Sequence, residues 1–257
     1  MDVIIIGVTA SLIAGLMTGV GALGVYFVRT LSPKIEDSML SFAAGIMLAA
    51  SIFSLIIPAI SYGEIHFSSK DYAVAWVVFA IMCGAVALYL IHEYAPHEHF
   101  QAGHEGPDTE KLSRIWLFII AITLHNFPEG MAVGVGFAGE DIANGYNLAI
   151  GIGIQNIPEG LAVALSLLSV GYSKHTSFFI AFITGLAEPI GGFIGTLAST
   201  FSGIFLPFSL AFAAGAMLFI ISNEIIPETH RGQFATRATF ALLIGFGLMM
   251  YLDATLG

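Results

Sequence analysis

Long apolar runs alternate with short polar connections along the whole chain. A helix needs about 20 apolar residues to cross the hydrocarbon of a bilayer, and eight runs reach this length. They predict eight transmembrane helices, over residues 3–28, 38–60, 72–95, 114–138, 144–170, 176–200, 205–227 and 235–256. One connection, residues 96–113, is longer, polar and rich in histidine, which is typical of a loop. The pattern therefore predicts an all-α polytopic membrane protein with a single eight-span domain in the lipid bilayer.

The composition agrees with this class and excludes others. Hydrophobic residues make up 57% of the chain and charged residues 10%, against about 25% charged in soluble domains. The net charge of −10 argues against nucleic-acid binding. The single cysteine, Cys83, excludes an internal disulfide or a cysteine-rich metal site. Asp2 stands where a signal peptide has basic residues, so the first run is predicted to be a membrane span.

The basic residues lie almost entirely in alternate connections, and this distribution predicts the orientation. Lys70 is in a connection on the side of the termini, whereas seven residues lie on the opposite side: Arg29, Lys34, Lys111, Arg114, Lys174, Arg231 and Arg237. Loops rich in Lys and Arg face the cytoplasm. We therefore expect a protein of the inner or plasma membrane, with both termini outside and loop 96–113 in the cytoplasm.

Two pairs of spans contain matching short stretches of sequence, called words here, whose positions differ by 170 residues. Span two contains FAAGIML (42–48) and span seven contains FAAGAML (212–218), each followed by Ile-Ile-Pro. Span one contains Gly15-Leu16 and Gly21, and span six contains Gly185-Leu186 and Gly191. An odd number of crossings separates the members of each pair, so they run in opposite directions. This predicts an inverted repeat of spans 1–3 and 6–8 around a central pair, spans four and five. No correspondence between spans three and eight is visible.

Spans four and five share a second word, HNFPEG at residues 125–130 and QNIPEG at residues 155–160. An ionisable residue within a membrane span is costly and is a functional candidate by default. Helical spacing places one set of side chains on one face of each span: His125, Asn126 and Glu129 on span four, and Gln155, Asn156 and Glu159 on span five. Because the spans are antiparallel, we expect the two sets to meet at the bilayer midplane. Pro128 and Pro158 each remove a helical donor, which predicts broken helices that line a cavity.

The side chains of these two sets suit a divalent cation. They offer one imidazole, amide oxygens and two carboxylates without a thiolate, a combination that favours Zn²⁺, Fe²⁺ or Mn²⁺ and argues against Cu⁺. Two facing carboxylates in a low dielectric repel each other and take up a proton. A bound dication removes this conflict, so we expect metal binding to compete with protons.

Further polar residues extend the candidate site. Glu188 stands beside Pro189 within span six and is expected in the central site. Asn223 and Glu224, nearer the cytoplasmic end of span seven, are expected on an exit path. His230 is either an exit ligand or a capping residue. The loop histidines His97, His99 and His104 either capture metal weakly in the cytoplasm or belong to a solvated linker.

The doubled motif in eight spans resembles the ZIP family of divalent metal transporters, and the closing NEIIPETHRG resembles its prokaryotic GufA-like branch. The resemblance implies a two-metal centre. One metal would be bound by His125, Glu129, Gln155 and Glu159, and the second by Asn126, Asn156 and Glu188, with Glu129 and Glu159 bridging. Some relatives carry His at position 155 or Asp at 156, so this chain lacks one nitrogen donor and one charge. The resemblance also implies transport of Zn²⁺, and of Fe²⁺, Mn²⁺ or Cd²⁺, into the cytoplasm, a homodimer, and an elevator motion of spans 1, 4, 5 and 6 against 2, 3, 7 and 8.

The alternative is an intramembrane metal-dependent hydrolase. Its usual signature, HExxH, is absent, because His125 and Glu129 are separated by three residues. A catalytic zinc needs three strong protein ligands and an open position for water, and the span interiors offer one obvious histidine. A di-iron oxidase needs Glu-x-x-His pairs, which are missing, and a purely structural membrane protein leaves the paired glutamates unexplained. We therefore expect a transporter and not an enzyme.

Overall fold

The computed structural model describes residues 3–94, 97–99, 103–105, 114–138, 142–169, 171–199 and 204–256, with the backbone alone at 97–99, 103–105, 114–122 and 199. In chain order its helical elements are α1 (Val3–Ala22), a 3₁₀ turn (Leu23–Tyr26), α2 (Pro33–Ala49), a π-helical segment (Ala50–Ile56), α3 (Ile57–His66), α4 (Lys70–Tyr94), α5 (Arg114–Gly136), α6 (Ile142–Ser169), α7 (Lys174–Gly185), α8 (Ala187–Ser199), α9 (Phe205–Ile220), a second π-helical segment (Ile221–Ile225), α10 (Ile226–His230) and α11 (Ala235–Leu256).

Helices occupy all eight predicted spans. Within the described residues, seven helical stretches are long and apolar enough to cross a membrane: Val3–Tyr26, Pro33–His66, Lys70–Tyr94, Ile142–Ser169, Lys174–Ala198, Phe205–His230 and Ala235–Leu256. Helix α5 occupies the remaining predicted span, 114–138. The prediction of a helical polytopic membrane protein is therefore confirmed. Within the polar connection 96–113, strands β1 (His97–His99) and β2 (Gly103–Glu105) pair antiparallel.

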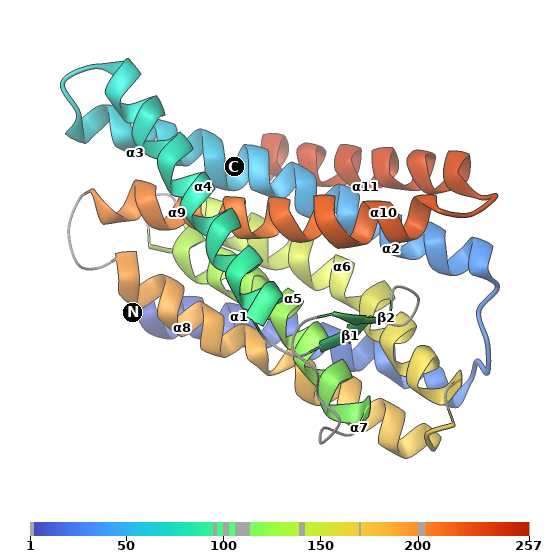
Figure 1. Ribbon diagram of the computed structural model, residues 1–257. Coiled ribbons are helices and arrows are strands. Elements are labelled where there is room, and N and C mark those ends of the chain that lie inside the picture. The colour runs from blue at the N-terminus through green and yellow to red at the C-terminus, as the bar shows by residue number, and fades with distance from the viewer. Residues whose placement is uncertain are drawn as a thin grey trace.

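The helices form two packed groups that meet along α5 and α6 (Figure 1). In the first group, α1 packs against α6, α7 and α8, and α5 packs against α8. In the second group, α2 packs against α11 and α4 packs against α9. The groups meet where α6 lies against α2 and where α5 lies against α9. The motif helices α5 and α6 are thus the part of the first group that contacts the second, and their central residues are enclosed on several sides.

Glycines bring the backbones of α2 and α11 into direct contact. A Cβ atom at Gly45 would lie 2.0 Å from the carbonyl oxygen of Leu242, and one at Gly245 would lie 2.0 Å from that of Phe42. Helices in lipid gain little from the hydrophobic effect between them and associate through such close packing of small residues. The glycine in the word FAAGIML is therefore a helix-packing residue.

The same contact recurs between α4 and α9. A Cβ atom at Gly215 would lie 2.0 Å from the carbonyl oxygen of Ile81, and one at Gly84 would lie 2.0 Å from that of Phe212. Phe42 and Phe212 are the first residues of the two repeated words. Gly84 of span three and Gly245 of span eight therefore pack on the repeated word in the same way, although the sequences of these two spans show no common motif.

The helix break lies elsewhere than predicted. Helices α5 and α6 run without interruption through Pro128 and Pro158, so the expectation of broken helices at these prolines was wrong. The interruption is at Leu186, between α7 and α8. Pro189 follows in the first turn of α8, where N–H groups have no helical acceptor, so its missing donor costs nothing there. Glu188 then lies in the same first turn, where the helix dipole favours a negative charge.

Two π-helical segments precede Pro58 and Pro227 at equivalent places in the second and seventh spans. Pro58 has no N–H to donate to the carbonyl of Ser54, one turn earlier. The side-chain Nδ2 of Asn144 on α6 donates to this carbonyl instead, at 2.9 Å. An irregular helix is tolerated in a membrane protein where another group satisfies the freed carbonyl, and Asn144 does so here.

Candidate metal centre

The first motif lies in the second half of α5 with its polar side chains turned inward. Asn126 and Glu129 are fully buried, and the side chain of His125 is 20% exposed. One helical turn separates His125 from Glu129, so both project from the same face of α5. The α5 motif therefore brings an imidazole, an amide and a carboxylate to the interface between the two helix groups.

The second motif lies in the middle of α6 and is connected to α8 and α1. Gln155 and Asn156 are fully buried, and Glu159 is partly buried. Gln155 Nε2 donates to Asn156 Oδ1 at 2.8 Å. Asn156 Nδ2 donates to Glu188 Oε1 at 2.6 Å and to the carbonyl of Ala14 at 2.8 Å. The structure thus brings Gln155, Asn156 and Glu188 together, with Asn156 as the connecting residue.

Several buried polar atoms in these two motifs and in α8 have no hydrogen-bond partner among the described residues. They are both side-chain polar atoms of Asn126, both carboxylate oxygens of Glu129, Oε1 of Gln155 and Oε2 of Glu188. Leaving a buried polar group unsatisfied costs about 1–3 kcal/mol, and more when it is charged. Such atoms need an explanation, and a proton, water or a cation would each satisfy a carboxylate oxygen.

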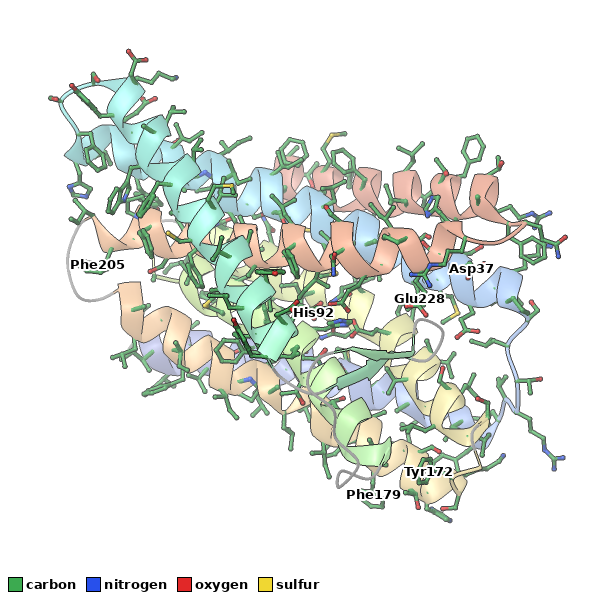
Figure 2. The ribbon with its side chains drawn as sticks, viewed as in Figure 1. Asp37, His92, Tyr172, Phe179, Phe205 and Glu228 are labelled. Atoms are coloured by element: carbon green, nitrogen blue, oxygen red, sulfur yellow. The ribbon has the colours of Figure 1, made fainter. Side chains whose placement is uncertain are left out.

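Glu224, predicted on an exit path, contacts His125 directly. His125 Nε2 is hydrogen-bonded to Glu224 Oε2, and Glu224 Oε1 lies 3.2 Å from Nδ1 of His92. His92 belongs to the last turn of α4 (Figure 2) and is buried. Glu224 therefore joins α4, α5 and the second π-helical segment. From the sequence, His92 was grouped with the histidine-rich loop that follows it, and its contact with Glu224 was not predicted.

The other residues predicted on the exit path have different environments. Asn223 is exposed. His230 Nδ1 lies 3.0 Å from the carbonyl of Ile226, and its Nε2 lies 3.1 Å from Thr239 Oγ1. These contacts connect α10 to α11 and fit the capping role better than the ligand role. His97, His99 and His104 lie in β1 and β2, and their side chains lie outside the described residues.

Within the part of the chain that the structure describes, no three His, Cys, Asp or Glu side chains converge in a way that could hold a metal ion. Instead, two of the candidate ligands make separate contacts with different residues. His125 is bound to Glu224, and Glu188 is bound to Asn156. A metal site that used the whole predicted set would therefore require His125 to leave Glu224.

The fold and this centre define a polytopic membrane protein with buried carboxylates and amides inside its helix bundle. The family model described as ZIP Zinc transporter matches residues 95–253. A zinc transporter of Myxococcus xanthus, GufA, is 45% identical over 251 residues, which cover 98% of this chain and 99% of that protein. The zinc transporter ZIPB of Bordetella bronchiseptica is 43% identical over 240 residues, covering 93% of this chain and 78% of that protein. Human zinc transporter ZIP11 is 33% identical, covering 94% of each chain.

These similarities extend over nearly the whole chain. The chain belongs to the ZIP zinc transporter family, and its relationship to GufA and ZIPB assigns it to the prokaryotic members. It is a transporter and not an enzyme, so the hydrolase alternative no longer applies.

Proposed function

We propose that this protein carries divalent metal, zinc first and also iron, manganese or cadmium, into the cytoplasm through a site on α5, α6 and α8. The relatives named above are zinc transporters by their names. The observation that carries the proposal is the pair of fully buried glutamates, Glu129 and Glu188, with three carboxylate oxygens that have no partner among the described residues. A dication compensates buried negative charge that no described basic residue neutralises.

The site is proposed to hold two metal ions. One is bound by His125, Glu129, Gln155 and Glu159, and the second by Asn126, Asn156 and Glu188, with Glu129 and Glu159 bridging. Four of these residues support this assignment, because each has a buried side-chain oxygen without a hydrogen-bond partner among the described residues: Asn126, Glu129, Gln155 and Glu188. These ligands are hard or borderline donors, which suit zinc, iron and manganese.

Metal release is proposed to run past Glu224 and His92. Glu224 contacts His125, so a ligand of the first metal is already connected to the next acid toward the predicted cytoplasmic side. In this proposal His125 exchanges between the metal and Glu224. Glu224 and His92 together offer a carboxylate and an imidazole, which are common zinc ligands.

An inverted repeat is proposed to relate spans 1–3 to spans 6–8 and α5 to α6. Equivalent backbone contacts support it. A Cβ atom at Gly130 of α5 would lie 2.0 Å from the carbonyl oxygen of Glu188, and one at Gly160 of α6 would lie 2.0 Å from that of Thr18. Thr18 and Glu188 differ by the same 170 positions as the repeated words, and the two glycines differ by 30. The recurring contacts of Gly84 and Gly245 on the repeated words agree with this relation.

Transport is proposed to occur by an elevator motion of α1, α5, α6, α7 and α8 against α2, α3, α4, α9, α10 and α11. The support is that the helices pack as these two groups. A homodimer, both termini outside the cell and a cytoplasmic 96–113 segment remain predictions.

The proposal is tested by zinc uptake into proteoliposomes that contain the purified full-length chain and a trapped zinc indicator. Glu129→Gln and Glu159→Gln keep the side-chain size and remove one negative charge each. Initial uptake should fall by about tenfold or more, because even changes to groups around metal ligands cost about 10–100-fold in affinity. The wild-type protein should take up zinc without the chemical conversion of any other substrate, as expected of a transporter.

A matched control is Glu64→Gln, which removes a carboxylate paired with Lys70 at the surface, where both side chains are solvent-exposed. This variant should transport at the wild-type rate. If Glu129→Gln and Glu159→Gln both fold and transport as fast as Glu64→Gln, the proposed site is wrong.

A further inference from the structure

A cavity of about 340 Å³ lies where α2 and α11 begin, at the end of the molecule predicted to face the cytoplasm. Its lining comes from three helices. Lys34, Ser38 and Phe42 lie on one face of α2, Pro158 comes from α6 and Arg237 comes from the first turn of α11. The cavity therefore lies at the junction of the two helix groups and touches the proline of the α6 motif.

The cavity concentrates positive charge in a chain that has little of it. The protein has eight Lys and Arg residues and a net charge of −10, yet Lys34 and Arg237 line this one cavity. Neither residue forms an ion pair with any carboxylate of the described residues. The acids of the same helix turn, Glu36 and Asp37, do not line the cavity, because helical spacing directs them to another face of α2.

The helix directions add to this charge. Helices α2 and α11 both begin at this end of the molecule and run the same way through the bundle (Figure 1). The N-terminus of a helix carries a partial positive charge, which favours anions and phosphate groups in particular. Two N-termini and two basic side chains therefore act together on one cavity.

The rest of the lining is apolar. Ile35, Met39, Phe42 and Pro158 form it, and Ile35 is 48% exposed. A free inorganic anion gains nothing from these side chains, whereas a lipid places its phosphate at the basic residues and its glycerol and acyl carbons along the apolar wall. Basic pockets between transmembrane helices on the cytoplasmic side are suited to anionic lipid headgroups.

We propose that this cavity binds the phosphate group of an anionic phospholipid of the inner leaflet through Lys34 and Arg237. A lipid there contacts α2, α6 and α11 at once and so joins the two helix groups. The inference does not depend on which ion is transported or on the number of metal ions in the central site.

The test measures lipid binding to the full-length protein in a neutral detergent, by native mass spectrometry and by the shift of the melting temperature. Phosphatidylglycerol should bind and raise the melting temperature, and phosphatidylcholine should do so much less. In Lys34→Gln/Arg237→Gln, affinity for phosphatidylglycerol should fall by about tenfold or more, since each basic residue near an anionic lipid contributes measurably. Lys34→Arg/Arg237→Lys keeps both charges and should restore binding.

Arg29→Gln is the matched control, since Arg29 is exposed on the same side of the protein and does not line the cavity. It should bind phosphatidylglycerol as the wild type does. Unchanged binding by a folded Lys34→Gln/Arg237→Gln variant would overturn the site. If millimolar inorganic phosphate stabilises the wild type as much as phosphatidylglycerol does, and removes the effect of the lipid, the assignment to a lipid is overturned in favour of a free anion.

Discussion

The close contact between α2 and α11 makes a quantitative prediction for Gly245→Ala. The new Cβ atom would lie 2.0 Å from the carbonyl oxygen of Phe42, whereas ordinary contacts begin at 3.4 Å. The neighbour is backbone and cannot rotate away, so the two helices must separate by about 1.4 Å. Overpacking of this kind costs about 1–3 kcal/mol, which outweighs the gain of up to about 1 kcal/mol from replacing glycine in a helix.

The assay is thermal unfolding of the purified protein in detergent, followed by circular dichroism. With about 2–4 °C per kcal/mol for a chain of this size, the melting temperature of Gly245→Ala should lie roughly 2–12 °C below that of a glycine-to-alanine variant of the same helix in which the new Cβ atom meets no neighbour. The control is Gly247→Ala on the same helix, where nothing lies within 4 Å of the new Cβ atom. This variant should melt at the wild-type temperature or slightly above it. If both variants melt together, within about 1 °C of the wild type, the packing argument is refuted.

Two further predictions concern the polar centre. Glu224→Gln keeps the size of the side chain but removes the carboxylate shared by His125 and His92, so zinc uptake into proteoliposomes should slow in a variant that circular dichroism shows to be folded; unchanged uptake would argue against Glu224 on the release path. Asn156→Asp removes the amide that donates to Glu188 and to the carbonyl of Ala14 and adds a buried carboxylate. The metal-free protein should therefore melt several degrees lower, and added Zn²⁺ should recover the loss. A melting temperature that does not respond to Zn²⁺ would contradict ligation at this position.

Much of the fold was predictable because membrane spans obey a local rule. Each apolar run had to satisfy its backbone within one helix, so run length alone predicted the eight helical stretches. The two α5 and α6 motifs were recognisable for a similar reason, since a buried glutamate beside a proline is costly within a span wherever it packs. The effect of the prolines was not predictable in the same way. Pro128 and Pro158 are accommodated inside continuous helices, and the break occurs at Leu186.

The sequence by itself determined which segments are helical and which side chains share a face of α5 or α6, because these properties depend on spacing along one helix. The tertiary structure alone decided how the helices are rotated and paired. His92, His125 and Glu224 meet although no spacing relates them, and Gly84 and Gly245 make equivalent contacts although spans three and eight share no motif. Such contacts depend on the packing of whole helices against one another, which is set by many small-residue contacts acting together and cannot be obtained from any single span.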